Sequence, residues 1–465
     1  MKLYSESKNY KLYQGNMLDM LDVIEPNSVD SIVTDPPYEI GFMGKSWDNS
    51  GIAFQKETWE KCLRVLKPGG HLLAFGGSRT YHRIACAIED AGFEIRDCIM
   101  YIYGSGFPKS MNIGLAIDKK NGIESKVIGV GKSGVSSRAY QSEETTTAGA
   151  YQVKQAQNEW KGWGSAMKPA YEPIIVARKP FSGTLVDNVM EYGVGGINID
   201  ECRVPAQQGE YDIRHYTKED CFQNLTPKKS QFQVKPQLEG RFPANIIHDG
   251  SEEATKDMPT TKNNTQTHTA KNSNNNINFN ASKEVSVIGY SDEGSVSRYF
   301  KTCEFSELDD EYYDEPKRYF YCAKASKQDR DEGLEGFENK VKVFNGQSSE
   351  SSKNIKDVKQ RFTTVAKNVH PTVKPTSLMA YLVRLVTPKG GTILDPFNGS
   401  GSTGKATMLE NAENNKEYKY IGVELTEEYL PISKARIEFG EHYNPVVKKE
   451  TKKQKETTKS KRSLI

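Results

Sequence analysis

Apolar residues along this chain occur in short continuous runs that alternate with stretches in which they recur every three or four positions. Short apolar runs are typical of buried strands, and the longer periodic stretches are typical of helices. The predicted strands are Tyr10–Tyr13, Val29–Val33, His71–Phe75, Phe93–Tyr103, Ile174–Ala177, Thr392–Leu394 and Tyr420–Val423. The predicted helices are Met17–Ile24, Ala53–Leu66, Tyr81–Ala91, Ser377–Val386, a helix that includes Ala406–Leu409, and Glu427–Arg436. This alternation predicts an α/β fold with a mostly parallel sheet that is covered on both faces.

The regular alternation fails between Lys179 and about Val365. Short apolar pieces interrupt polar sequence there, and Thr260–Ser282 is rich in Asn and Thr. Such a tract has too little apolar surface to repay the entropy of ordering, so we expect residues 260–282 to be disordered. We therefore expect one sheet from residues 1–180 and 366–445, an inserted region at 181–365, and a flexible basic tail at 446–465.

A glycine-rich turn follows the predicted strand Thr392–Leu394, in the sequence Asp395-Pro-Phe-Asn-Gly-Ser-Gly-Ser-Thr-Gly-Lys405. Glycines let a ligand approach the backbone, and the new helix offers free N–H groups and a partial positive charge. The pattern fits a dinucleotide, with Glu424 as the ribose-binding acid, and it fits S-adenosylmethionine equally well. A nucleoside triphosphate fits poorly, because Ala406 stands where the magnesium-binding hydroxyl should be. The glycines alone do not decide between the first two.

A second motif, Asp35-Pro36-Pro37-Tyr38, follows the apolar strand Val29–Val33. Paired prolines fix the backbone and leave carbonyl groups whose neighbours have no N–H. An exocyclic amine lying on the ring of Tyr38 could donate one hydrogen to the Asp35 carboxylate and one to the Pro36 carbonyl. The nitrogen lone pair would then be free to react.

With this motif early, His370-Pro-Thr-Val-Lys-Pro375 later and the glycine turn after it, the sequence resembles the DNA amino-methyltransferases, which methylate adenine N6 or cytosine N4. The order of the motifs is similar to that of the circularly permuted beta group of that family. The resemblance covers roughly residues 10–180 and 366–440. It implies the S-adenosylmethionine-dependent methyltransferase fold, circularly permuted and carrying a long insertion, with the target-base pocket in the first part and the cofactor site in the second.

The resemblance also implies roles for individual residues. The catalytic residues would be Asp35, Pro36, Pro37 and Tyr38. The cofactor-binding residues would be Asn16, Lys374, Asp395, Phe397, Gly399, Gly401, Thr403 and Glu424. Relatives usually carry Asp where this chain has Asn16, and an Asn there can instead favour a turn. Lys374 would pair with the cofactor's carboxylate or cap a turn.

Two aromatic residues are candidates for contact with the target base. Trp47 ends a Gly-containing loop expected to cover the base, and Phe107 lies in a turn after the strand Phe93–Tyr103. A base inside a duplex cannot reach a sheet-edge pocket, so the enzyme would flip it out of the double-stranded DNA. Transfer would be a direct displacement in which positioning contributes roughly 7–11 kcal/mol.

The expected target is adenine N6, because relatives with Asp at the first position of the tetrapeptide mostly act on adenine. Cytosine N4 remains the alternative. Methylation of cytosine C5 would need a nucleophilic cysteine after a proline, and none of the seven cysteines follows a proline. In the family, target recognition resides in the inserted region, here 181–365. The resemblance leaves a homodimer and a cognate restriction enzyme open as partners.

Composition adds limits to this picture. Hydrophobic residues make up 36% of the 465 residues and the mean hydropathy is −0.68, so solvated insertions are expected. The absence of a long apolar run and of an apolar leader predicts a cytoplasmic protein without membrane contact. The cysteines form no C-x-x-C pair, so neither a zinc site nor another metal site is predicted.

Net charge is only +2, but the tail 446–465 holds eight Lys or Arg against two Glu, and a non-specific DNA contact is one interpretation of it. Two rival functions stay open. One is an NAD-dependent oxidoreductase, which the glycines and Glu424 support but which leaves the Asp35–Tyr38 motif unexplained. The other is a DNA-binding relative without catalysis, which the intact tetrapeptide argues against.

Overall fold

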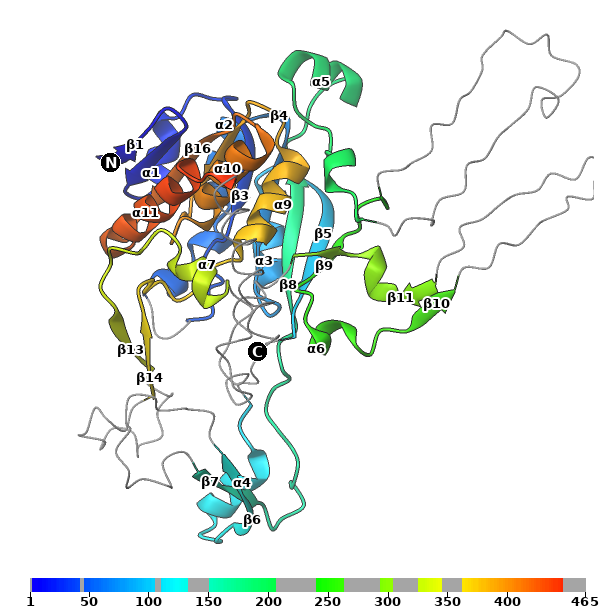
Figure 1. Cartoon of the computed structure of the whole chain (residues 1–465), viewed down its shortest axis with the longest axis vertical. Coiled ribbons are helices and arrows are strands. Elements are labelled where there is room, and N and C mark those ends of the chain that lie inside the picture. Colours follow the sequence, from blue (N-terminus) through cyan, green and yellow to red (C-terminus); the bar gives the residue numbers. More distant parts are fainter. Residues whose placement is uncertain are drawn as a thin grey trace, which may run out of the picture.

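The computed structural model describes residues 2–41, 46–104, 110–132, 150–205, 240–262, 293–303, 325–344 and 362–445. Ten strands of this part form one twisted sheet in the order β1-β2-β16-β15-β3-β4-β8-β5-β9-β12 (Figure 1). Their bounds are β1 Lys2–Glu6, β2 Tyr10–Gln14, β3 Val29–Thr34, β4 Leu66–Phe75, β5 Glu94–Ile102, β8 Tyr171–Arg178, β9 Ile246–His248, β12 Lys301–Thr302, β15 Thr392–Asp395 and β16 Lys419–Glu424. All neighbours pair in parallel except at β1 and β8, which run against their neighbours.

The two parts of the chain interleave in this sheet. Strands β15 and β16, from the end of the chain, lie between β2 and β3, from its beginning. Every residue of β3 is buried, as expected of a central parallel strand with a covered face on either side. The predicted mostly parallel α/β sheet is present.

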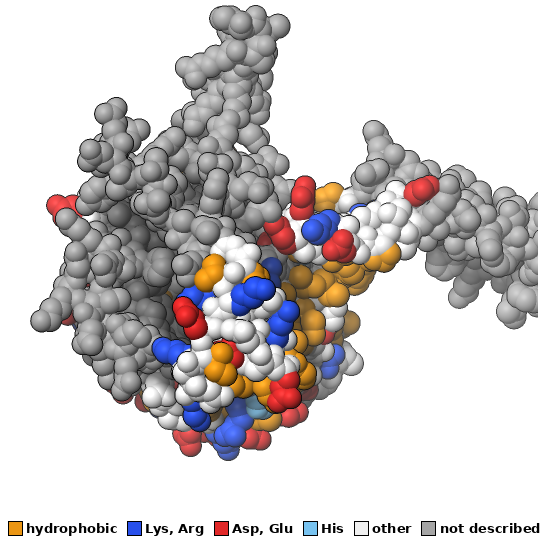
Figure 2. Space-filling model, turned by 90° about the horizontal axis from the view of Figure 1, so that it is seen from below, with side chains coloured by type: hydrophobic (Ala, Val, Ile, Leu, Met, Phe, Trp, Pro, Cys, Tyr) orange, Lys and Arg blue, Asp and Glu red, His pale blue; other side chains and the backbone are white. Residues whose placement is uncertain are grey.

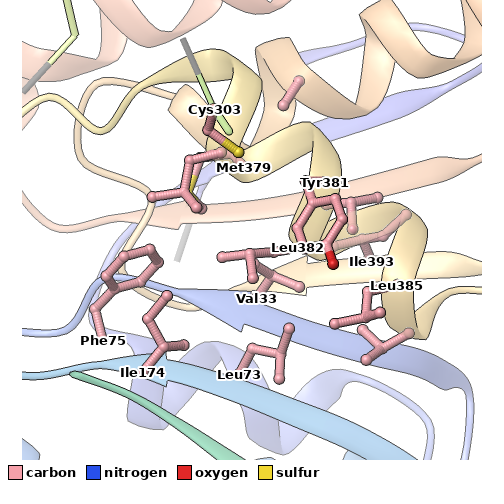
Figure 3. Close-up of a cluster of buried hydrophobic side chains, with 14 of the residues drawn as sticks. Val33, Leu73, Phe75, Ile174, Cys303, Met379, Tyr381, Leu382, Leu385 and Ile393 are labelled. Carbon is pink, nitrogen blue, oxygen red and sulfur yellow. The ribbon is translucent and has the colours of Figure 1, made fainter. Parts of the chain in front are cut away.

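Each face of the sheet is covered by helices from a different part of the chain. Helices α1 (Met17–Val23), α2 (Lys56–Val65) and α3 (Tyr81–Asp90) pack on the face that Ile32 and Leu72 point toward. Helices α9 (Thr376–Val386), α10 (Ser402–Asn414) and α11 (Leu430–Glu441) cover the opposite face, which receives Val33 and Leu73. Figure 3 shows the second cluster, with α9 side chains over Val33, Leu73 and Ile393. Alternate residues of one strand thus enter different cores.

The inserted region contributes to the sheet, which the sequence did not indicate. Strand β9 pairs in parallel with β5, β12 pairs with β9, and Cys303 packs into the core under α9. The boundary predicted at residue 180 is therefore not the edge of the sheet. The predicted disorder of residues 260–282 is wrong for the first three, because Thr260–Lys262 forms β10 against β11, Glu293–Ser295. The rest of that tract lies outside the described residues, as does the tail 446–465.

One helix boundary was wrong by several residues. Helix α2 begins at Lys56 and ends at Val65, and Leu66 already belongs to β4, whereas the sequence predicted a helix from Ala53 to Leu66. The sequence Lys67-Pro-Gly-Gly70, which is typical of a turn, is part of the strand. There Gly69 has φ +78°, and a Cβ at Gly70 would lie 2.9 Å from Asp30 O. Here tertiary pairing overrides the local turn signal.

Smaller elements surround the sheet. They are α4 Ile113–Lys120, α5 Leu185–Tyr192, α6 Glu252–Thr255, α7 Lys327–Asp331, and the hairpins β6–β7 (Lys126–Lys132 with Ala150–Gln155) and β13–β14 (Lys340–Phe344 with Phe362–Ala366). Helix α4 and the β6–β7 hairpin project from the sheet and lie at the bottom of Figure 1. No helix in the described ranges is long and apolar enough to span a membrane.

Candidate active site

The two sequence motifs meet at one edge of the sheet. Strands β3 and β15 are parallel neighbours, with Leu394 beside Ile32, so both end at the same edge. The Asp35–Tyr38 motif follows β3 there, and the glycine turn follows β15. Neighbouring strands lie about 4.8 Å apart, so residues more than 350 positions apart in the chain become adjacent. Open sheets of this kind bind ligands at the carboxyl ends of their strands.

A buried ammonium group stands at the end of β3. Lys374 Nζ lies 2.9 Å from Asp35 Oδ1, 3.2 Å from Glu172 Oε2 and 3.0 Å from the Tyr38 hydroxyl oxygen. It also lies over the ring of Tyr38, 5.2 Å from its centroid, and 4.8 Å from that of Phe75. Burial disfavours its charge, but the two carboxylates outweigh burial and raise the pKa of Lys374. The group is therefore a charged Lys374 held by two acids and an aromatic face.

The contacts of Lys374 differ from those considered for it in the sequence. Its ammonium lies at the end of β3 and is paired with Asp35 and Glu172. The predicted pairing of Lys374 with the cofactor's carboxylate stays a prediction. Glu172, on β8, was not predicted as a site residue at all. The available signal was an acid placed between Tyr171 and Pro173, directly before the apolar run Ile174–Ala177 of the same strand.

The segment after β3 is fixed by a buried carboxylate. Asp48 accepts hydrogen bonds from the backbone N–H groups of Tyr38, at 2.8 Å, and Glu39, at 3.1 Å. Glu39 has φ +55°, and its carboxylate in turn accepts from the backbone of Gly51. Burial, followed by the charges of Asp35 and Glu172, raises the pKa of Tyr38 well above its ordinary value. Tyr38 is thus a neutral phenol in a defined position.

The glycine turn after β15 has the backbone that glycine permits. Gly399 has φ +52° and Gly401 has φ +72°, and Gly401 directly precedes α10. A Cβ at Gly401 would lie 2.6 Å from Ser433 Oγ. The Glu424 carboxylate, at the end of β16, accepts from the backbone N–H of Gly399 and from that of Thr426, each at 2.7 Å. Burial raises the pKa of Glu424 to about 7, and these two bonds oppose the rise.

Asp395 and Thr403 tie the turn to the neighbouring strand. Asp395 Oδ1 accepts from the Thr34 hydroxyl and Oδ2 accepts from the Thr403 hydroxyl, both at 2.7 Å. Burial raises the pKa of Asp395 to about 6, with the two hydroxyls opposing it. Asp395 and Thr403 are almost fully buried, so they hold the backbone of the turn in place through these internal hydrogen bonds. Phe397 is half-buried and packs near Trp59, with ring centroids 6.5 Å apart.

The lysine after the turn cannot hold a phosphate. Lys405 is fully buried, and its ammonium contacts Asp329 Oδ1 at 2.7 Å and Glu332 Oε2 at 2.9 Å. Arg436, also fully buried, donates to Ser400 O, Ser400 Oγ and Asp329 O. The back of the turn is therefore tied to the α7 segment of the inserted region, and the triphosphate interpretation loses its cation.

Beside the turn, Asn16 and Leu425 flank the end of β16. Gly15 N–H donates to Glu424 O, and the Asn16 side chain accepts from Leu18 N–H, so Asn16 caps α1. Leu425 is 63% exposed and offers an apolar face next to Glu424. It lines a hollow of about 350 Å³, together with Trp47 and Tyr429.

Trp47 lies nearer to the glycine turn than the sequence suggested. Its ring stacks on that of His370 with centroids 6.3 Å apart, and a Cβ at Gly399 would lie 3.0 Å from His370 Nε2. The predicted contact of Trp47 with the target base stays a prediction. Phe107 lies outside the described residues. The described residues hold no cluster of three or more His, Cys, Asp or Glu side chains able to bind a metal.

Comparison of the sequence with models of known protein families shows the family to which this chain belongs. The model of the N6/N4 DNA methylases matches residues 29–435, which is most of the chain, so the chain belongs to that DNA methylase family. Enzymes of this family draw their methyl group from S-adenosylmethionine, so the predicted family, fold class and cofactor are confirmed.

Individual relatives match shorter stretches. The chain is 21% identical over 231 residues to the type II methyltransferase M.HindIII of Haemophilus influenzae, and this match covers 40% of this chain and 64% of M.HindIII. It is 35% identical over 106 residues to the type II methyltransferase M.HpaI of Haemophilus parainfluenzae, and this match covers 22% of this chain and 34% of M.HpaI. It is 33% identical over 96 residues to the DNA adenine methyltransferase YhdJ of Escherichia coli, 21% of this chain and 31% of that one. The matches thus span about a third to two thirds of these relatives.

Among solved structures, the PvuII DNA methyltransferase, described as cytosine-N4-specific, aligns with 92% of this chain and 86% of its own at 12% identity and a TM-score of 0.38. TTHA0409 of Thermus thermophilus, a DNA modification methylase by its description and complexed with S-adenosyl-L-methionine, aligns with 93% of this chain and 96% of its own at 13% identity and a TM-score of 0.33.

Proposed function

We propose that this protein is a site-specific DNA methyltransferase that methylates the exocyclic N6 of an adenine flipped out of double-stranded DNA. The observation that carries the proposal is the nitrogen already held at the end of β3. Lys374 Nζ is bound by the Asp35 carboxylate over the face of Tyr38, which is the environment an exocyclic amine would need. A base amine enters beside this ammonium and donates to the second carboxylate oxygen of Asp35.

Each protein group then has a definite task. Lys374 ties Asp35 to Glu172, because its ammonium contacts both carboxylates and fixes their positions beside Tyr38. Asp35 accepts a hydrogen of the amine and directs its lone pair, and Tyr38 stacks on the base. Tyr38 keeps its hydroxyl proton, so its side chain adds no negative charge to those of Asp35 and Glu172.

The residues around the glycine turn fit S-adenosylmethionine. Gly399 and Gly401 allow the left-handed backbone of the turn, with φ +52° and +72°. The Glu424 carboxylate stands at the end of β16 to accept from ribose hydroxyls, and Leu425 offers a face to the adenine ring. When bound, S-adenosylmethionine supplies an electrophilic methyl group. Asn16 stands on the same side as Glu424, where its amide can face the adenine ring. The chain's contribution is to orient the amine and exclude water.

The choice of adenine rests on Asp35, since the family members with Asp at this position mostly act on adenine. Cytosine N4 is the second candidate, and the relatives include an enzyme named for each base. The oxidoreductase alternative has no use for the Asp35, Lys374 and Glu172 cluster.

The test is to incubate the purified protein with unmethylated duplex DNA and isotopically labelled S-adenosylmethionine, and to separate the nucleosides after digestion. We expect labelled N6-methyl-2′-deoxyadenosine. Label in N4-methyl-2′-deoxycytidine would overturn the base assignment, and label in 5-methyl-2′-deoxycytidine would overturn the proposed chemistry.

A further inference from the structure

A small lobe projects from the sheet edge that carries the base pocket. It consists of residues 110–132 and 150–168, with α4 and the β6–β7 hairpin (Figure 1). Its chain leaves the sheet after β5 and returns into β8, where Ile102 pairs with Tyr171 and Tyr103 N–H donates to Ala170 O. Glu172, which contacts Lys374, is the second residue of β8. The stem of the lobe therefore adjoins the base pocket.

The lobe is held together by polar contacts. The fully buried Asp118 accepts from Gln157 N–H at 2.9 Å and from the Asn158 side chain at 2.6 Å. Gly114 packs so closely against Ala156 that a Cβ there would lie 2.7 Å from the Ala156 Cβ. These contacts give the lobe a defined shape despite a very small apolar core.

The surface of the lobe is basic. Among the residues whose side chains are described, six lysines are exposed: Lys119, Lys120, Lys126, Lys154, Lys161 and Lys168. The exposed acids in the same ranges are Glu124 and Glu159, because Asp118 is buried. The excess of positive charge contrasts with a net charge of +2 for the whole chain. Seen from below, blue basic side chains stand beside orange hydrophobic ones on the projecting part at the centre (Figure 2).

Large apolar side chains are exposed among the lysines. Trp163 is 59% exposed and Met167 is 91% exposed, and Trp160 lies edge-on to Trp163 with centroids 5.2 Å apart. Exposed aromatic and Met side chains in a group mark a binding surface. Met167 is five residues before Glu172, so an extended chain places it within roughly 17 Å of the base pocket.

We infer that this lobe binds the DNA duplex beside the flipped base. The inference rests on the proposed function, because it takes the pocket of Asp35 and Tyr38 as the place of the target base. The duplex lies along the sheet edge from which the lobe projects, and the exposed lysines of the lobe contact its backbone phosphates. Trp163 and Met167 pack against sugars and bases where stacking is broken, as apolar side chains do in proteins that deform DNA. Part of DNA recognition thus lies before β8, outside the inserted region.

The experiment measures the affinity of the full chain for duplex DNA as a function of salt, for the wild type and for Lys119→Gln/Lys120→Gln/Lys126→Gln. Each phosphate contact contributes about 0.9 to the slope of log affinity against log salt. We expect the triple variant to lose about 2 to 3 from that slope and to bind at least tenfold more weakly at 0.15 M salt. The control is a triple variant of equal charge, Lys2→Gln/Lys8→Gln/Lys11→Gln, at the far edge of the sheet, which should retain the wild-type slope.

A second variant pair tests the apolar contacts. Trp163→Ala and Met167→Ala should weaken DNA binding severalfold without changing the slope, and neither should change S-adenosylmethionine affinity. A lobe variant with wild-type slope and affinity would overturn the inference, as would equal losses in the control triple. DNA affinity is measured without methyl transfer, so a wild type that methylates DNA while its lobe variants bind normally would refute this inference and leave the proposed function standing.

Discussion

Glu424 offers the sharpest test of the cofactor site, because its protonation changes near neutral pH. Burial raises the pKa of this carboxyl to about 7, and hydrogen bonds from the backbone N–H groups of Gly399 and Thr426 and from the Thr426 side chain oppose the rise. A ribose hydroxyl that donates to Glu424 favours the ionised form. Cofactor affinity should therefore fall as pH decreases through 7 and level off above pH 8.

The size of the effect follows from the pKa. If the cofactor binds the ionised form, each pH unit below the pKa costs a factor approaching ten, so the dissociation constant at pH 6 should be about tenfold that at pH 8. Replacing Glu424 by Ala removes a hydrogen bond to a charged group and should cost on the order of 1.5–3 kcal/mol at pH 8. Folding responds to the same group in the opposite direction. The folded protein holds this proton more tightly than the unfolded chain, so Glu424 makes the free energy of unfolding fall as pH rises from 4.5 to 7.

The assay is calorimetric titration with S-adenosylmethionine between pH 6 and pH 8. Glu424→Gln should bind more weakly at pH 8 and show a much smaller dependence on pH. The matched control is Glu428→Gln, which removes an exposed carboxylate from the hollow lined by Trp47, Leu425 and Tyr429. Its affinity for S-adenosylmethionine should follow that of the wild type at each pH. A wild-type affinity that stays constant across this range, or a Glu424→Gln variant that keeps the full dependence, would refute the assignment of Glu424 to the ribose.

The remaining predictions concern the base pocket and the turn. Lys374→Met leaves the buried Glu172 and the partly buried Asp35 without their cation and should lower the free energy of unfolding by about 3 kcal/mol at pH 8 in urea titrations. Adding Glu172→Gln should restore part of that loss, and a double variant no more stable than the single one would contradict the ion cluster. Asp35→Ala should abolish methyl transfer in a tritiated-methyl assay and leave cofactor affinity nearly unchanged, so full activity would remove Asp35 from the site. Gly401→Val should weaken cofactor binding, because φ +72° and Ser433 at 2.6 Å both oppose a side chain; unchanged binding would show that the turn is not the cofactor site.

Much of the catalytic half of this protein can be predicted from sequence, because local patterns carry it. The strand before Asp35 carries apolar Val29, Ile32 and Val33, and the strand before the glycine turn carries Ile393 and Leu394. Both strands end where the motifs begin. Parallel pairing then brings the motifs to the same edge by a general rule. The order of the motifs supplied the family.

The partner of Lys374 could not be predicted in the same way. Asp35 and Glu172 come from β3 and β8, which flank β4, and their meeting with Lys374 depends on tertiary packing across more than 200 residues. The strands β9 and β12 were missed for a related reason. They contain three and two residues, too few to show a period, and they form because β5 offers an edge to β9 and β9 offers one to β12.

The central claim is that the Asp35 pocket methylates an adenine amine in DNA, and long-read sequencing of DNA from a host that expresses this chain tests it most directly. The account predicts N6-methyladenine at one recurrent sequence motif with the wild type, and unmodified motifs with Asp35→Ala at equal protein level. A genome without any new methylated base in the presence of soluble wild-type protein that binds S-adenosylmethionine would contradict it, as would modification that persists in the Asp35→Ala host.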